Sequence, residues 1–135
     1  MTLEAGLVGR DPARLDAFYT RVMGFKRIDR LDFAVGSVHK FRRGAARLKI
    51  FFPSDRVDPV AGVEPWFRPG GWRYAALHVD RPDDVDALVA AVEAADGRVV
   101  MPPANHRAGA RMAMVCDPEG NVWELLAEPA GEDGS

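Results

Sequence analysis

The sequence predicts an α+β fold made of two similar β-α-β-β-β units. Three observations support this prediction: an internal repeat, a proline-led helix start in each copy of the repeat, and a strong turn signal near the C-terminus. Neither unit can bury its apolar face alone. The two units are therefore expected to pack together, within the chain or across a dimer.

The repeat relates the first half of the chain to residues 70 positions later. Pro12 falls on Pro82, and Asp16 falls on Asp86. The other matches are Leu7 with Leu77, Leu15 with Val85, Ala17 with Ala87, Phe18 with Leu88, Val22 with Val92, and Glu4 with Tyr74. The predicted helices and their leading strands thus coincide.

In the first half, residues 3–9 are expected to form a strand, with Glu4 on the face opposite to its leucines. Asp11 is suited to cap the helix that follows, and Pro12 fits the first helical position, which needs no N–H donor. Gly24 is placed to end this helix. Strands are expected next over residues 25–28, 33–41 and 47–52, with a turn at 42–44.

Prolines and glycines break any regular pattern between the halves, which predicts a linker over residues 54–71. The second half then repeats the order, with a helix from Pro82 to Gly97. Its strands are expected over 74–79, 98–101, 110–116 and 122–126, with a loop at 102–109. The chain is thus predicted to be one domain over 1–129, with modules 1–53 and 72–129 and a frayed tail at 130–135.

The turn signal is Asp117-Pro118-Glu119-Gly120-Asn121, followed by Val122-Trp123-Glu124-Leu125-Leu126. Proline holds the preceding residue extended, and Gly-Asn tolerates the positive φ of a tight reversal. Glu124 then lies on a strand between apolar residues. It is expected at an exposed edge or with a partner, because an unpaired buried charge is costly.

Composition excludes several classes of function. The 135 residues carry a net charge of −2, with no basic stripe typical of nucleic-acid binding. No apolar run approaches the roughly 18 residues of a membrane span, and the N-terminus lacks the pattern of a signal peptide. A single cysteine cannot form an internal disulfide. A soluble cytoplasmic protein is expected, with no nucleic-acid or membrane partner.

Three segments resemble the vicinal-oxygen-chelate superfamily, the glyoxalase, bleomycin-resistance and extradiol-dioxygenase group. These segments are Asp11-Pro12-Ala13-Arg14-Leu15-Asp16-Ala17-Phe18-Tyr19 with Val22-Met23-Gly24-Phe25, Leu77-His78-Val79-Asp80 through Val85-Asp86-Ala87-Leu88, and the turn segment 117–125. The resemblance implies two βαβββ modules whose sheets curl around a shared cup, in a homodimer. The cup lies within one chain or at the dimer interface.

In metal-dependent members of that family, four strands each supply one ligand to a divalent ion. The resemblance places these positions at Glu4, Lys49 (or Phe51), Tyr74 and Glu124, where the family usually has His or Gln, an acid, His and Glu. Only Glu124 matches. Lys49 and Phe51 cannot chelate, and a phenol is a poor ligand at neutral pH. No cofactor is therefore expected, with a divalent metal on Glu4 and Glu124 as the alternative.

Glu4 and Glu124 would face the same cup, where two carboxylates could perform acid/base chemistry. In the alternative, Lys49 neutralises both of them. His78 shares a face with Tyr74 and is a candidate base or hydrogen-bond donor, or else a hydrogen-bonded core residue.

Other candidates are weaker. His39 is expected on an apolar strand face, His106 in an exposed loop, and Cys116 as an inert thiol at the end of a buried strand. Trp66, Phe67, Trp72 and Tyr74 are expected to form an aromatic cluster, either as walls of the cup or as dimer core.

Two functions follow. The first is a small-molecule-binding protein of the bleomycin-resistance kind, with a metal-free cup. Its ligand would be mid-sized and partly aromatic, carrying an amine or several hydroxyls, and contacting Lys49, Tyr74, His78, Trp66 and Trp72. The second is a lyase or isomerase of the glyoxalase type that uses Glu4 and Glu124, with or without a divalent metal.

Overall fold

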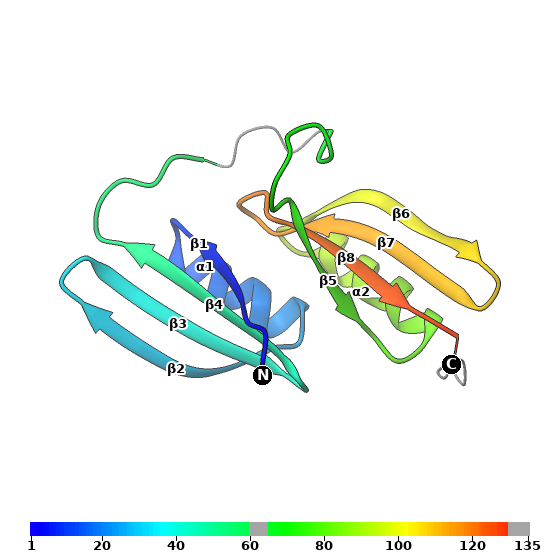
Figure 1. The fold of residues 1–135 in the computed structure, drawn as a ribbon, viewed down its shortest axis with the longest axis horizontal. Coiled ribbons are helices and arrows are strands. Elements are labelled where there is room, and N and C mark those ends of the chain that lie inside the picture. Colours follow the sequence, from blue (N-terminus) through cyan, green and yellow to red (C-terminus); the bar gives the residue numbers. More distant parts are fainter. Residues whose placement is uncertain (60–64, 130–135) are drawn as a thin grey trace. The chain divides into compact units, whose positions relative to one another are not determined.

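The computed structural model describes residues 1–59 and 65–129, and these form two compact units (Figure 1). The first unit runs from Met1 to Ala61 and the second from Gly62 to Ser135, so the boundary falls within the linker expected at 54–71. The predicted frayed tail at 130–135 and the linker residues 60–64 lie outside the described residues.

The first unit contains β1, α1 and three further strands, in the predicted order. A π-helical turn, η1, continues α1 directly. The bounds are β1 Ala5–Val8, α1 Pro12–Ala17, η1 Phe18–Val22, β2 Lys26–Phe33, β3 Gly36–Arg43 and β4 Ala46–Pro53. Asp11 caps α1 as expected, because its Oδ1 accepts a hydrogen bond from the Arg14 backbone N–H at 3.1 Å.

The second unit repeats this order and confirms the predicted fold class. Its elements are β5 Tyr74–His78, α2 Pro82–Ala94, β6 Arg98–Arg107, β7 Ala110–Cys116 and β8 Val122–Ala127. In the described residues the strands form two four-stranded mixed sheets, ordered β1-β4-β3-β2 and β5-β8-β7-β6. β1 pairs with β4 in parallel, and β5 pairs with β8 in parallel. The other pairings are antiparallel.

One face of each sheet packs against its helix, and the alternation of side chains along the strands sets that face. In the first unit the buried residues of β3 and β4 are His39, Phe41, Leu48, Ile50 and Phe52. A Cβ built at Gly9 would meet side-chain atoms of Leu15 and Phe52 at 2.7 Å, so the helix lies tightly on this face. Val85, Val89 and Val92 form the equivalent buried stripe of α2.

The other face of each sheet is not covered by its own helix. We call these the open faces. In β1 and β4 the open face carries Gly6, Val8, Lys49 and Phe51. In β5 and β8 it carries Tyr74, Ala76, His78, Val122, Glu124 and Leu126.

Two of the predicted elements were wrong. The strand expected over 33–41 is the end of β2, a two-residue turn at 34–35, and most of β3. Phe33 pairs directly with Gly36, which closes the hairpin. Phe33 therefore lies on the open face, and not with His39 and Phe41 as the single strand implied.

The loop expected over 102–109 is also wrong, because β6 continues through both of its prolines to Arg107. Its pairing with β7 shifts register three times along this stretch. β6 is an edge strand, so Pro102 and Pro103 are tolerated at bulges where no ladder N–H is needed. His106 consequently lies on an exposed strand and not in a loop.

Among the described residues, none of the helices has the length and apolar character needed to cross a membrane.

Candidate functional site

Glu124 lies at the centre of the open face of the second unit. Its direct cross-strand neighbours are Ala76 on β5 and Met114 on β7, and Val122 and Leu126 flank it along β8. It is partly buried, and no described residue forms a hydrogen bond or ion pair with it. A carboxylate in apolar surroundings and without a partner is available to an incoming ligand.

Aromatic rings lie beside this carboxylate in the same unit. Trp66 packs edge-on against Tyr74, with ring centroids 5.1 Å apart, and against Phe67 at 5.7 Å. Trp66 also packs on the cluster of Met114, Cys116 and Val122. Part of the predicted aromatic cluster is thus formed over the open face, whereas Trp72 is 97% exposed.

A shallow pocket of about 430 Å³ adjoins this cluster. It is lined by Pro65, Trp66 and Phe67 from the linker and by Val100 and Met101 from β6. The lining is apolar apart from the backbone, and Phe67 and Met101 remain exposed. This surface suits a planar or apolar group more than a charged one.

His78 shares the open face with Tyr74 and Ala76, as the alternation predicted. Its side chain is exposed, and Nδ1 lies 3.8 Å from Glu128 Oε1, a loose contact. Glu128 is engaged more closely by Arg107, at 2.6 Å. His78 is therefore an exposed side chain and not the hydrogen-bonded core residue of the alternative interpretation.

In the first unit, Lys49 lies on the open face beside Glu4, which directly precedes β1. Their charged atoms are 3.9 Å apart, and the Lys49 side chain is 51% exposed. The stem of Lys49 passes over Gly6, where a Cβ would meet its Cγ and Cε at 4.0 Å. Glu4 thus has a nearby cation within its own unit, in a loose and solvated ion pair.

The two sheets place Lys49 and Glu124 at equivalent positions. Gly6 pairs with Lys49 in the first unit, and Ala76, its counterpart in the repeat, pairs with Glu124 in the second. Phe51, the other residue considered for this position, pairs with Val8 instead. The register therefore selects Lys49 over Phe51 as the counterpart of Glu124.

Within the described residues, no group of three or more His, Cys, Asp or Glu side chains is close enough to hold a metal ion. Cys116 is a free, buried thiol at the end of β7, as expected from its strand. Its neighbours Met114 and Val122 are apolar.

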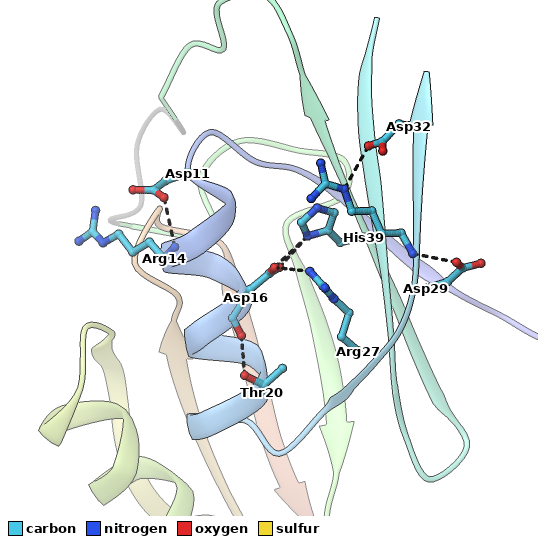
Figure 2. A network of polar contacts seen from close by, with 9 residues as sticks. Asp11, Arg14, Asp16, Thr20, Arg27, Asp29, Asp32 and His39 are labelled. Carbon is cyan, nitrogen blue, oxygen red and sulfur yellow. Dashed lines mark hydrogen bonds and ion pairs between the residues drawn. The ribbon is translucent and has the colours of Figure 1, made fainter. Parts of the chain in front are cut away.

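The sequence did not indicate a polar network on the helix side of the first unit (Figure 2). The buried His39 ring bonds through Nδ1 to both carboxylate oxygens of Asp16, at 2.9 and 3.0 Å. Arg27 donates to Asp16 Oδ2 at 3.0 Å, and Thr20 Oγ1 donates to the Asp16 backbone oxygen at 2.7 Å. In the sequence, the only feature that pointed to Asp16 was its match with Asp86 in the repeat.

In the second unit, Asp86 forms the corresponding hydrogen-bonded contact between helix and sheet. Arg111 on β7 donates Nε and Nη2 to its two carboxylate oxygens, at 2.7 and 2.9 Å. This hydrogen-bonded guanidinium lowers the pKa of the Asp86 carboxyl below its usual value. Both helices are therefore fastened to their sheets by an aspartate at the same position of the repeat, although the cationic partners differ.

Solved structures of low sequence identity share this fold. A glyoxylase/bleomycin resistance protein/dioxygenase domain from Frankia sp. EAN1pec superimposes with a TM-score of 0.80 at 16% identity, covering 98% of this chain and 94% of that one. TioX from Micromonospora sp. ML1 gives 0.67 at 22% identity, covering 95% and 98%. A mutant glyoxalase I from Zea mays gives 0.75 at 20% identity, covering 93% of this chain and 43% of that one.

Among curated proteins, no relative matches the sequence. The family model described as Glyoxalase/Bleomycin resistance protein/Dioxygenase superfamily matches residues 3–125, which is most of the chain. The internal repeat, the mixed sheet in each unit and this match agree with one another. The chain belongs to the glyoxalase/bleomycin resistance protein/dioxygenase superfamily.

Proposed function

We propose that this protein binds a small molecule without a metal ion, on the open face of β5, β8 and β7, and that it does so as a homodimer. The ligand is a mid-sized, partly aromatic compound that carries an amine or several hydroxyls. Trp66 and Tyr74 supply the aromatic contacts, Glu124 the charged contact, and His78 a polar contact at the rim.

The pairing of Lys49 with Gly6 carries this proposal. The resemblance implies that in metal-dependent members each strand of this kind supplies a metal ligand, and Glu124 is the usual residue type at that position in the second unit. Its counterpart in the first unit is an ammonium, which repels a divalent cation. Glu4 is already close to Lys49, and Tyr74 is a phenol, so the four positions do not fit a transition metal.

The surroundings of Glu124 support an amine or hydroxyl donor as the ligand group. The carboxylate has apolar neighbours and no partner among the described residues, so a ligand that donates to it satisfies an unmet acceptor. The ring of Tyr74 is half exposed beside Trp66 and offers a face to an aromatic or cationic group.

Metal content tests the first part of the proposal. The purified protein is expected to carry far less than one equivalent of Zn, Ni, Fe or Mn per chain, because the donor set is incomplete. Elemental analysis by mass spectrometry measures this directly. About one transition metal per chain, lost in Glu124→Gln, would contradict the proposal.

A thermal-shift screen with aromatic amines and polyhydroxylated aromatics tests the second part. At a hundredfold its Kd, a ligand raises the free energy of unfolding by about 2.7 kcal/mol. Tyr74→Ala and Glu124→Ala are expected to abolish the shift, whereas Tyr74→Phe, which keeps the ring, should retain most of it. A shift that survives both alanine variants would place the ligand elsewhere and overturn the assignment of this face.

A second function, a lyase or isomerase of glyoxalase type, is favoured by the same unpartnered carboxylate. A carboxylate that has no partner among the described residues can accept a proton from a bound substrate. Glu124 would be the base and Glu4 the second carboxylate. Turnover of a candidate substrate that is lost in Glu124→Gln, while the ligand-induced thermal shift remains, would select this function over binding alone.

A further inference from the structure

β2 forms an outer edge of the first sheet, and its backbone has no strand partner on that side. It is the last strand in the order β1-β4-β3-β2, and all of its residues are exposed. Among the described residues, no segment other than β3 pairs with it. An exposed edge strand offers its free N–H and C=O groups to a strand of another molecule.

The other outer strands of the described sheets are less suited to such pairing. β1 has only four residues and β5 only five, and the pairing of β6 with β7 shifts register three times. Short strands and repeated bulges are the usual protection of a sheet edge. β2 has eight residues, and after one shift between Arg27 and Asp29 its pairing is regular to Phe33. This edge therefore lacks the protection that the others have.

The hairpin geometry determines which backbone groups of β2 face outward. Phe33 pairs with the residue that follows the two-residue turn, so this pair is hydrogen-bonded, and such pairs alternate along an antiparallel ladder. Phe33, Leu31 and Asp29 therefore direct their N–H and C=O groups toward β3. Arg30 and Asp32 direct theirs outward. In agreement with this, the Arg30 N–H donates to the side-chain Oδ1 of Asp29, at 2.8 Å.

A second copy of β2 fits this edge in one register. When two identical strands pair antiparallel about a two-fold axis, outward-facing residues must lie opposite outward-facing residues. Placing Arg30 or Asp32 opposite itself would set like charges against each other, which is destabilising. With Leu31 on the axis, Arg30 of each copy lies opposite Asp32 of the partner subunit. The edge is therefore complementary to itself in charge as well as in hydrogen bonding.

The side chains involved are available for this pairing. Arg30 Nε lies 3.1 Å from Asp32 Oδ1 within the strand, but both side chains are more than half exposed, so this ion pair contributes little. Leu31 is also exposed, on the opposite face of β2. Pairing with a second copy exchanges the solvated ion pair for two cross-strand pairs and covers each Leu31 with that of the other copy.

We propose that the outer edge of β2 is the interface of the homodimer, where the first units of two copies join their sheets into one continuous sheet. This inference rests on the proposed function, since it specifies the interface of the dimer proposed there. Asp29 releases the Arg30 N–H, which then donates to the backbone of the other copy. The alternating charges of β2 disfavour strands of other sequence and accept its own copy.

Charge reversal tests the register. Arg30→Asp and Asp32→Arg each set like charges opposite each other across the axis, so each is expected to raise the dimer dissociation constant about tenfold or more. Mixed in equal amounts, the two variants regain unlike charges at both positions. They should form a heterodimer with an affinity within about threefold of wild type. Sedimentation velocity measures the association of each variant and of the mixture.

Hydrogen exchange followed by NMR locates the contact. The Arg30 amide should exchange at least about tenfold more slowly in the wild-type dimer than in Asp32→Arg, because only the dimer gives it a ladder acceptor. The amides of Leu31 and Phe33 face β3 in both proteins, so their exchange should change little. Equal exchange of the Arg30 amide in the two proteins would contradict the pairing.

Arg56→Asp and Asp58→Arg are the matched controls. Arg56 and Asp58 form an exposed ion pair with the same spacing, at 2.9 Å, beyond the end of β4. Reversing either charge should leave the dimer dissociation constant within about twofold of wild type. A wild-type dimer that is unchanged in Arg30→Asp, or a mixture of the two β2 variants that stays monomeric, would overturn this interface but not the homodimer. A wild-type monomer at every concentration would overturn both.

Discussion

Asp117→Ala is expected to lower the free energy of unfolding by about 4 kcal/mol, because three hydrogen bonds converge on one buried carboxylate. Asp117 is 2% exposed. Its Oδ1 accepts from the backbone N–H groups of Glu119 and Asn121, at 2.9 and 3.0 Å, and its Oδ2 accepts from Asn121 Nδ2 at 2.9 Å. The truncation removes the acceptor of these three hydrogen bonds in the turn between β7 and β8.

Urea denaturation at pH 7 measures this loss. Asp117→Asn is the control, since its amide oxygen can still accept from the two backbone N–H groups while the negative charge is gone. It is expected to cost about half as much as the alanine variant. A loss below about 1 kcal/mol for Asp117→Ala would show that the backbone of the turn alone holds β7 and β8 together.

The parts of the fold that could be predicted from the sequence depend on local chemistry. Asp11 caps α1, and the Asp-Pro-Glu-Gly-Asn segment forms the turn before β8, with Gly120 at a φ of 94°. Each signal lies within a few neighbouring residues, so no knowledge of the remaining fold was needed. The repeat then predicted the order of elements in both units, and the topology of the two sheets matches it.

The errors arose where tertiary pairing overrides local propensity. The hairpin between β2 and β3 turns at Ala34 and Val35, which carry none of the usual turn residues, and Gly36 alone marks it with a φ of 150°. In β6 the sequence Pro102-Pro103 indicated a loop. An edge strand with shifted register accepts both prolines, and sequence alone does not reveal which strand lies at an edge.

For the candidate site too, features within one strand could be predicted from the sequence, whereas features that depend on pairing between strands could not. Alternation along single strands correctly grouped Tyr74 with His78, because a period of two needs only one strand. The choice between Lys49 and Phe51 needed the register between β1 and β4. The like-charged pairs Lys40–Lys49 and Arg42–Arg47 needed the register between β3 and β4, which alternation along a single strand does not supply.

The repeat relates Asp16 to Asp86. Asp16 bonds to the buried His39 and Asp86 to the more exposed Arg111, so the two hydrogen-bonded contacts between helix and sheet can be compared. Asp86 and Arg111 form a bidentate pair in which the Asp86 side chain is 45% exposed, so solvent screens it. Because Arg111 lowers the pKa of Asp86 in the folded state, the pair contributes stability above about pH 4. This contribution is lost as the pH falls through the lowered pKa, so Asp86→Asn and wild type should converge in acid.

Asp16→Ala is expected to lower the free energy of unfolding by about 3 kcal/mol at pH 7, a larger loss than that of Asp86→Asn. The reason is its partner: His39 is 3% exposed, and its Nδ1 keeps no other acceptor when the carboxylate is removed.

Replacing both members, in Asp16→Ala with His39→Leu, should recover about 1 kcal/mol or more of that loss, because no buried polar group is then left without a partner. Chemical denaturation of the single and double variants gives this coupling energy. Equal losses for the two aspartates, or strict additivity of Asp16→Ala and His39→Leu, would show that the bond to the buried histidine does not fasten α1 to β3.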